Sequence, residues 1–191
     1  RKTNDDLMRI VIPLTFWVIL MAGPLIKLLF QRGAFDSQST ELVSVSLIAY
    51  SVIIILSPIG GLISNTLISL KDIKFVNWVA IIFIGMNAFF DWVLMKPFGH
   101  AGIAYSTSAI IIISVAFGYW WLKKRYKIAV FDFMRFLHLS AMNFILYIIL
   151  IVLKHILPEY MFMTIGNVSF FLIFVLLNEK LIRRFFSMRS F

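Results

Sequence analysis

One apolar stretch of the chain, residues 86–108 (MNAFFDWVLMKPFGHAGIAYSTS), contains a carboxylate, a carboxamide and a hydroxyl that could act together. Asp91 lies inside an apolar run, where an ionisable side chain points to a functional site. Asn87 precedes it by four residues, so on a helix the two side chains lie one turn apart on nearly the same face. If the chain forms an antiparallel helical hairpin turning at Gly99, Thr107 lies at the depth of Asp91. Such oxygen-only ligation with one carboxylate suits a hard monovalent cation.

Two other arrangements of Asp91 are compatible with the same residues. The carboxylate could lie close enough to the outer membrane interface to stay hydrated, or it could pair with Lys96, five residues further along. In either arrangement Asp91 would have no ion to bind.

The composition indicates the kind of structure that holds this hairpin. Hydrophobic residues make up 61% of the 191 residues, charged residues make up 14%, and the mean hydropathy is +0.95. These values are typical of an integral membrane protein, in which each span needs about 20 mostly apolar residues. We predict an all-α, polytopic bundle, because an open chain in hydrocarbon must satisfy its backbone internally. The six predicted spans are residues 10–30, 42–70, 75–95, 101–122, 136–157 and 161–178.

The net charge of +9 is distributed unevenly between alternate connections. Of the 18 Lys and Arg residues, 14 fall on one predicted side, and only Lys27, Arg32, Lys96 and Lys154 fall on the other. This pattern argues against nucleic-acid binding, and the positive-inside rule places both termini in the cytoplasm. A basic cluster at 123–127 adjoins Trp120 and Trp121, which is typical of an interfacial aromatic belt.

The predicted outer connection after the first span contains a turn motif made of Arg32, Gly33, Phe35 and Asp36. Asp36 and the following Ser37 are good N-cap candidates for the next helix. The simplest interpretation is a capped turn with a glycine, in which Arg32 helps to fix the turn.

Helix-breaking residues occur inside two of the predicted spans. Pro13 and Pro24 predict a kinked or shortened first helix. The second span carries Pro58, Gly60 and Gly61 near its middle, and these are hinge candidates if the break is more than a passive kink.

Several classes of function have no support in the sequence. The chain has no cysteine, so it can form no disulfide and has no thiol chemistry. His100 and His155 have no second histidine or carboxylate at ligand spacing, so no transition-metal site is predicted. No phosphate-binding glycine loop and no hydrolytic constellation is present, and we expect a protein that is not an enzyme and needs no organic cofactor.

The order and spacing of several motifs resemble one transporter family. The motifs are LFQRGAFDSQST at 29–40, Ala49 with Tyr50, Asn87 with Asp91, and GHAGIAYSTS at 99–108. Together they look like the carboxy-terminal half of the MurJ/MviN-type lipid II flippases, within the multidrug/oligosaccharidyl-lipid/polysaccharide exporter superfamily. The similarity covers most of residues 7–125 and beyond about residue 131 rests on hydropathy alone.

The resemblance implies an architecture. Family members have fourteen spans, in two six-helix lobes around a central cavity and two further carboxy-terminal helices. On that template residues 1–125 hold four helices of the carboxy-terminal transport lobe, and residues 126–191 hold the two additional helices and a basic cytoplasmic tail. Because the chain also begins with Arg1, we expect it to be a fragment whose partner is a missing amino-terminal lobe.

The resemblance also implies a function. A member would flip an undecaprenyl-pyrophosphate-linked peptidoglycan precursor across the bacterial inner membrane by alternating access, with a lipid-linked oligosaccharide and membrane lipids as its partners. A sodium ion is thought to bind in the carboxy-terminal lobe of this family. The matching ligands here would be Asn87, Asp91, the backbone carbonyl of Ile103 and Thr107.

Two alternatives stay open. A polysaccharide-repeat flippase or a multidrug antiporter of the same superfamily would share the fold, and the cavity charges of the amino-terminal half would tell them apart. A non-transporting membrane scaffold is a different class, and it predicts that Asp91 tolerates substitution by Asn or Ala.

Overall fold

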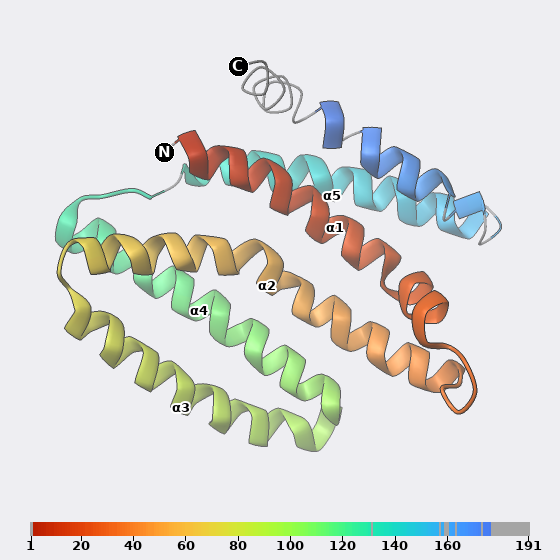
Figure 1. Ribbon diagram of the computed structural model, residues 1–191, viewed down its shortest axis with the longest axis horizontal. Helices are drawn as coiled ribbons and strands as arrows, with labels where there is room; N and C mark the ends of the chain where they lie inside the picture. The colour runs from red at the N-terminus through yellow and green to blue at the C-terminus, as the bar shows by residue number, and fades with distance from the viewer. Residues whose placement is uncertain are drawn as a thin grey trace, which may run out of the picture. The chain divides into compact units, whose positions relative to one another are not determined.

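The computed structural model describes residues 2–130, 132–156, 158, 161–162, 164–172 and 174–176, and, within these ranges, side chains from residue 6 onward except that of residue 153. The described residues form helices joined by short turns and no strand, which confirms the all-α prediction (Figure 1). The long helices are α1 (Lys2–Phe30), α2 (Ser37–Ser69), α3 (Ile73–Phe98), α4 (His100–Tyr126) and α5 (Phe133–Ile156).

Each of these five helices is long and apolar enough to cross a membrane, and together they identify a multi-pass membrane protein. They correspond to the first five predicted spans and extend beyond most of the predicted ends, although α2 ends at Ser69 and α5 at Ile156, each one residue before the predicted end. For the sixth, 161–178, the described part includes a shorter apolar helix at Thr164–Leu176. Residues 177–178 and the predicted basic tail lie outside the described residues.

The first helix is longer than predicted. Pro13 and Pro24 both lie inside α1, which continues through them to Phe30. Of the two predicted outcomes, a shortened helix is therefore wrong, and a kink at the prolines stays a prediction. In a membrane, neighbouring helices and hydroxyl side chains compensate for the backbone bond that a proline removes.

Contacts divide the chain into two compact units, which are residues 1–24 with 131–191, and residues 25–130. The predicted division at residue 125 concerns transport roles and stays a prediction. In the first unit an aromatic cluster joins α1 to α5, where Phe16 lies 5.9 Å from the ring of Tyr147. Trp17 stacks near Phe170 at 5.4 Å and donates its indole N–H to Asn167 at 3.0 Å.

In the second unit, α4 lies between α2 and α3 (Figure 1). Small residues allow α2 and α4 to approach closely, as is common in membrane bundles. A Cβ atom on Gly118 would lie 2.8 Å from the Cγ2 of Ile63, a distance that real Cβ atoms essentially never show. The buried Ser108 hydroxyl also donates to the carbonyl of Ala49 at 2.6 Å. This polar link ties the two helices together.

The α3–α4 pair is a tight hairpin. Gly99 joins the helices with φ at +58°, a left-handed conformation that glycine adopts without strain. Three residues later Gly102 packs against the backbone of Leu94, and a Cβ at this position would fall on the Leu94 carbonyl. Apart from this hairpin contact α3 is little covered, since it has no fully buried residue and Trp78 is 66% exposed.

We predict that Gly102→Ala destabilises the complete protein by about 1–3 kcal/mol, because the added methyl group can be accommodated only if the hairpin backbone shifts. Thermal unfolding in detergent would measure the effect. Gly85→Ala on α3 is the matched control, since nothing lies within 4 Å of a Cβ there. The control should be neutral or slightly stabilising; equal melting temperatures for the two variants would contradict the close approach.

Candidate functional site

The hairpin brings the amide of Asn87 to a hydroxyl on the facing helix. The Ser106 hydroxyl donates to the side-chain oxygen of Asn87 at 3.0 Å and lies 3.4 Å from its backbone carbonyl. Ser106 is fully buried, with 0% of its surface exposed. The contact joins the middle of α3 to α4, about one helical turn along α4 from the close approach at Gly102.

Asp91 lies between these two contacts. Asn87 and Leu94 flank it on α3, and their partners on α4 are Ser106 and Gly102. The segment of α4 at the depth of Asp91 is therefore residues 103–105, which includes Ile103. The predicted hairpin is confirmed, and the register places Thr107 just beyond Ser106.

One oxygen of the Asp91 carboxylate is buried. Its Oδ1 atom has no hydrogen-bond partner among the described residues. Lys96, the alternative partner, has its ammonium group 3.9 Å from the centre of the Trp92 ring, in a cation–π contact. A buried acceptor without a donor is costly, so this oxygen is the feature of the hairpin that most needs a ligand.

The other two predicted ligands lie together on α4. The Thr107 hydroxyl donates to the Ile103 carbonyl at 2.9 Å, so these two oxygens lie together on one turn of α4. No described contact joins this pair to Asp91 or Asn87. The structure thus forms two pairs, Asn87 with Ser106 and Ile103 with Thr107, and their role in binding an ion stays a prediction.

Ser106 is the site residue that the sequence reasoning missed. Three hydroxyl residues follow one another at 106–108, and equal distance from Gly99 favoured Thr107 as the residue nearest the acidic face. Because the helices approach closely at Gly102, the residues of α3 and α4 that face each other are not those expected from counting outward from Gly99. The signal that could have identified Ser106 is that glycine, since small residues mark where helices touch.

The hinge candidates lie within an unbroken helix. Pro58 is inside α2, which runs from Ser37 to Ser69. A Cβ on Gly60 would lie 3.3 Å from the Cγ2 of Val115, whereas Gly61 has open space. Gly60 therefore serves helix packing, and bending at this position stays a prediction.

The outer turn motif is a capped turn. Asp36 is the N-cap of α2, and the backbone N–H of Ser39 donates to its carboxylate at 2.8 Å. This bond lowers the pKa of Asp36 below its ordinary value. Gly33 adopts φ of +59°, while Phe35 donates its N–H to the carbonyl of Arg32 at 3.1 Å. The Arg32 side chain is exposed.

A second acidic residue organises the basic end of the same unit. Asp72, in the turn between α2 and α3, accepts hydrogen bonds from the Trp121 indole at 3.1 Å and the Tyr126 hydroxyl at 2.8 Å. These bonds and the nearby Arg125 charge lower its pKa. Phe75 stacks on Trp121 with ring centres 4.2 Å apart. We call Asp72, Phe75, Trp121 and Tyr126 the aromatic clasp.

Among the residues that the structure describes, no group of three or more His, Cys, Asp or Glu side chains is placed to hold a metal ion. We call the four predicted ligands, Asn87, Asp91, the Ile103 carbonyl and Thr107, the oxygen cluster. They offer only oxygen atoms and a single carboxylate, which suits a hard cation.

We predict that, on the acid side of neutrality, the aromatic clasp loses stability only in strong acid. Because the pKa of Asp72 is lowered by folding, its contribution to stability is present above the ordinary carboxyl pKa of 3.8 and is lost as the pH falls through the lower folded value. Hydrogen exchange of the first turn of α3, followed from neutral to acidic pH, measures this. Asp72→Asn should exchange faster at neutral pH, whereas the N-cap variant Asp36→Asn should leave this turn unchanged. Protection that fades near neutral pH in the wild type would contradict the assignment.

Comparisons with known proteins identify one family. A sequence profile of the family described as "Lipid II flippase MurJ" matches residues 4–177. A protein of Synechocystis sp. named "Probable lipid II flippase MurJ" is 27% identical over 113 residues, which are 59% of this chain and 21% of that protein. The "Lipid II flippase MurJ" of Thermosipho africanus is 26% identical over 182 residues, covering 94% of this chain and 37% of its relative.

A solved structure titled "Lipid II flippase MurJ, inward closed conformation" has the same fold. Its TM-score with this chain is 0.74 at 24% sequence identity, and the match covers 94% of this chain and 37% of that structure. The chain therefore spans only part of the length of these relatives. Because the family profile covers nearly all of the described residues, the chain belongs to the lipid II flippase MurJ family.

Proposed function

We propose that this chain forms part of a flippase that moves a lipid-linked peptidoglycan precursor from the inner to the outer leaflet of a bacterial inner membrane. The observation that carries the proposal is the family profile across residues 4–177. The fold supports it, since the solved relative covers 94% of the chain. Transport moves the substrate without changing its bonds, so none of the residues here is assigned a catalytic role.

The proposal includes a sodium ion held by Asn87, Asp91, the Ile103 carbonyl and Thr107. The donor set fits a hard cation, because all four groups offer oxygen atoms and one carries charge. The buried Asp91 oxygen without a partner supports the same assignment. A bound cation would supply the positive charge that balances this carboxylate in an apolar environment.

Coupling to transport would act through the hairpin. Asn87 and Asp91 lie on α3, while Ile103 and Thr107 lie on α4. A ligand shared by both helices favours the arrangement in which they are close, and an equilibrium between two states shifts only by the differential affinity of the ligand. Alternating access would then use α3, which is weakly covered, with Pro58, Gly60 and Gly61 as the hinge in α2.

The orientation and the partners follow from the charge pattern. The basic end of the described unit, at Lys71 and 123–127, would face the cytoplasm. Both ends of the chain would then lie on the cytoplasmic side. The amino-terminal lobe of the complete protein would contribute the remaining substrate contacts, and membrane lipids would cover the outer helix faces.

We predict that Asp91→Asn abolishes rescue in a strain whose own lipid II flippase is depleted, while the wild-type complete protein restores growth. The substitution keeps the size of the side chain and removes the charge that a cation needs. Growth and membrane abundance are measured together. Asp36→Asn is the matched control, because asparagine also caps helices well and Asp36 lies outside the oxygen cluster.

Each outcome separates parts of the proposal. Rescue by both variants keeps the flippase and removes the ion site. Failure of the wild-type protein despite normal insertion overturns lipid II transport and points to another exported substrate. A stabilising shift in melting temperature by sodium over potassium, present in wild type and absent in Asp91→Asn, would support direct ion binding.

A further inference from the structure

A cavity of ≈ 330 Å³ lies between α2, α3 and α4 in the unit formed by residues 25–130. It is lined mainly by apolar side chains from all three helices, and none of the predicted cation ligands lines it. Its few hydroxyls belong to serines such as Ser114, whose hydroxyl already donates to the Ile111 carbonyl at 3.0 Å. The cavity therefore suits an apolar occupant.

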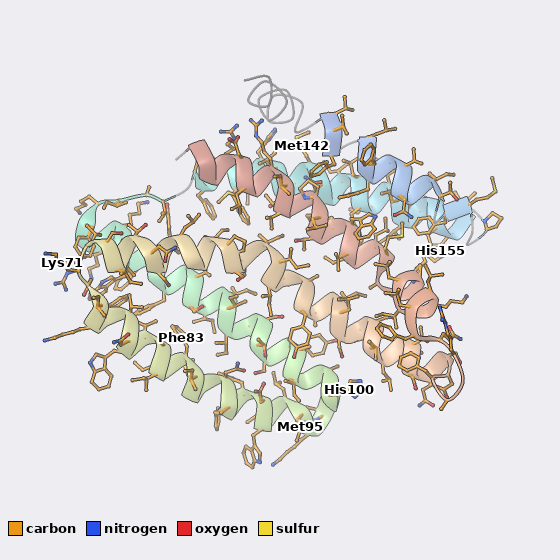
Figure 2. The ribbon with its side chains drawn as sticks, in the orientation of Figure 1. Lys71, Phe83, Met95, His100, Met142 and His155 are labelled. Carbon is orange, nitrogen blue, oxygen red and sulfur yellow. The ribbon has the colours of Figure 1, made fainter. Side chains whose placement is uncertain are left out.

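The cavity extends into the membrane from the basic end of the unit. On α3 the lining runs from Phe75, next to the start of the helix, to Phe83. Eight residues of helix rise about 12 Å, which is close to the ~15 Å of hydrocarbon in one leaflet. Figure 2 shows Phe83 midway along α3, between Lys71 at one end and Met95 with His100 at the other.

Basic residues lie near the end of the cavity that is nearest the membrane surface. Lys71 follows the lining residue Leu67 by four positions, and Lys74 directly precedes the lining residue Phe75. The exposed basic residues of the end of α4, at 123–125, complete this rim. We call these residues the basic rim.

The acidic residue beside the basic rim already has hydrogen-bond partners. Asp72 accepts bonds from Trp121 and Tyr126, and the Arg125 guanidinium lies 5.4 Å from the Trp121 ring centre. The Lys124 ammonium lies 4.7 Å from the Trp120 ring centre. Aromatic and cationic groups thus meet at the depth where lipid headgroups begin.

We propose that this cavity binds one anionic phospholipid of the cytoplasmic leaflet, with an acyl chain between α2, α3 and α4 and the phosphate on the basic rim. Charge complementarity selects the headgroup, because each lysine or arginine near an anionic surface contributes about 1 kcal/mol. The apolar lining and the depth of the cavity select the acyl chain. The site is separate from the oxygen cluster and does not depend on the proposed transport function.

Photocrosslinking tests the site in the complete protein. The protein is placed in phosphatidylcholine nanodiscs containing a minor amount of phosphatidylglycerol that carries a photoreactive group on its acyl chain. We expect labelled peptides from residues 75–83 and 111–118, which include lining residues of α3 and α4. The same probe with a phosphatidylcholine headgroup should label them much less.

Two kinds of variant distinguish binding of the acyl chain from binding of the headgroup. Ala80→Phe fills the cavity from α3 and should remove the labelling, whereas Ala88→Phe, on an exposed part of the same helix outside the lining, should not. Lys71→Asn and Lys74→Gln should weaken phosphatidylglycerol labelling roughly fivefold each. Asn suits Lys71 because that residue has φ of +61°. Lys154→Gln, exposed on α5, is the charge control.

Three results would overturn the proposal. Equal labelling by the two headgroups, or no effect of the lysine variants, would remove the anionic lipid. Even labelling along α5 and the lining helices would indicate general contact with the bilayer. Absence of label from 75–83 and 111–118 in the wild type would mean that another segment or the substrate tail fills the cavity. Melting temperatures of all variants confirm that lost labelling does not reflect unfolding.

Discussion

The contact between Gly102 and the backbone of Leu94 sets the geometry of the hairpin. Only a residue without a Cβ allows two helices to approach so closely, and this approach fixes which residues of α3 and α4 face each other. It brings Ser106 to Asn87 and places Asp91 at the depth of residues 103–105 of α4. The candidate ion site therefore depends on a glycine that offers no ligand itself.

The same hairpin is secured at its other end by a different kind of interaction. The aromatic clasp uses the Asp72 carboxylate and the stacked rings of Phe75 and Trp121. Between the two fixed ends, α3 contributes to a cavity against α2 and α4. Close backbone packing at one end and side-chain packing at the other leave space in between, which explains why the cavity lies beside the clasp and away from Gly102.

Hydropathy and charge predicted the helices and the hairpin, because a membrane leaves a chain few alternatives to helices. The facing residues were harder to predict. Counting from Gly99 favoured Thr107, whereas the close approach at Gly102 made Ser106 the partner of Asn87. The prolines of the first span were expected to kink or shorten the helix, and α1 continues through both to Phe30. The difference in register arises from packing between α3 and α4, which counting along a single sequence does not capture.

The oxygen cluster and the cavity follow opposite physical rules. Asp91 has a buried oxygen without a partner, and in hydrocarbon such a group is costly unless a cation or a donor reaches it. The cavity has mostly apolar walls, and its charges are confined to the rim. A small cation suits the first site and an amphipathic lipid suits the second. The two sites share α3 and α4, so a ligand that holds these helices at either site stabilises the hairpin on which the other site is built.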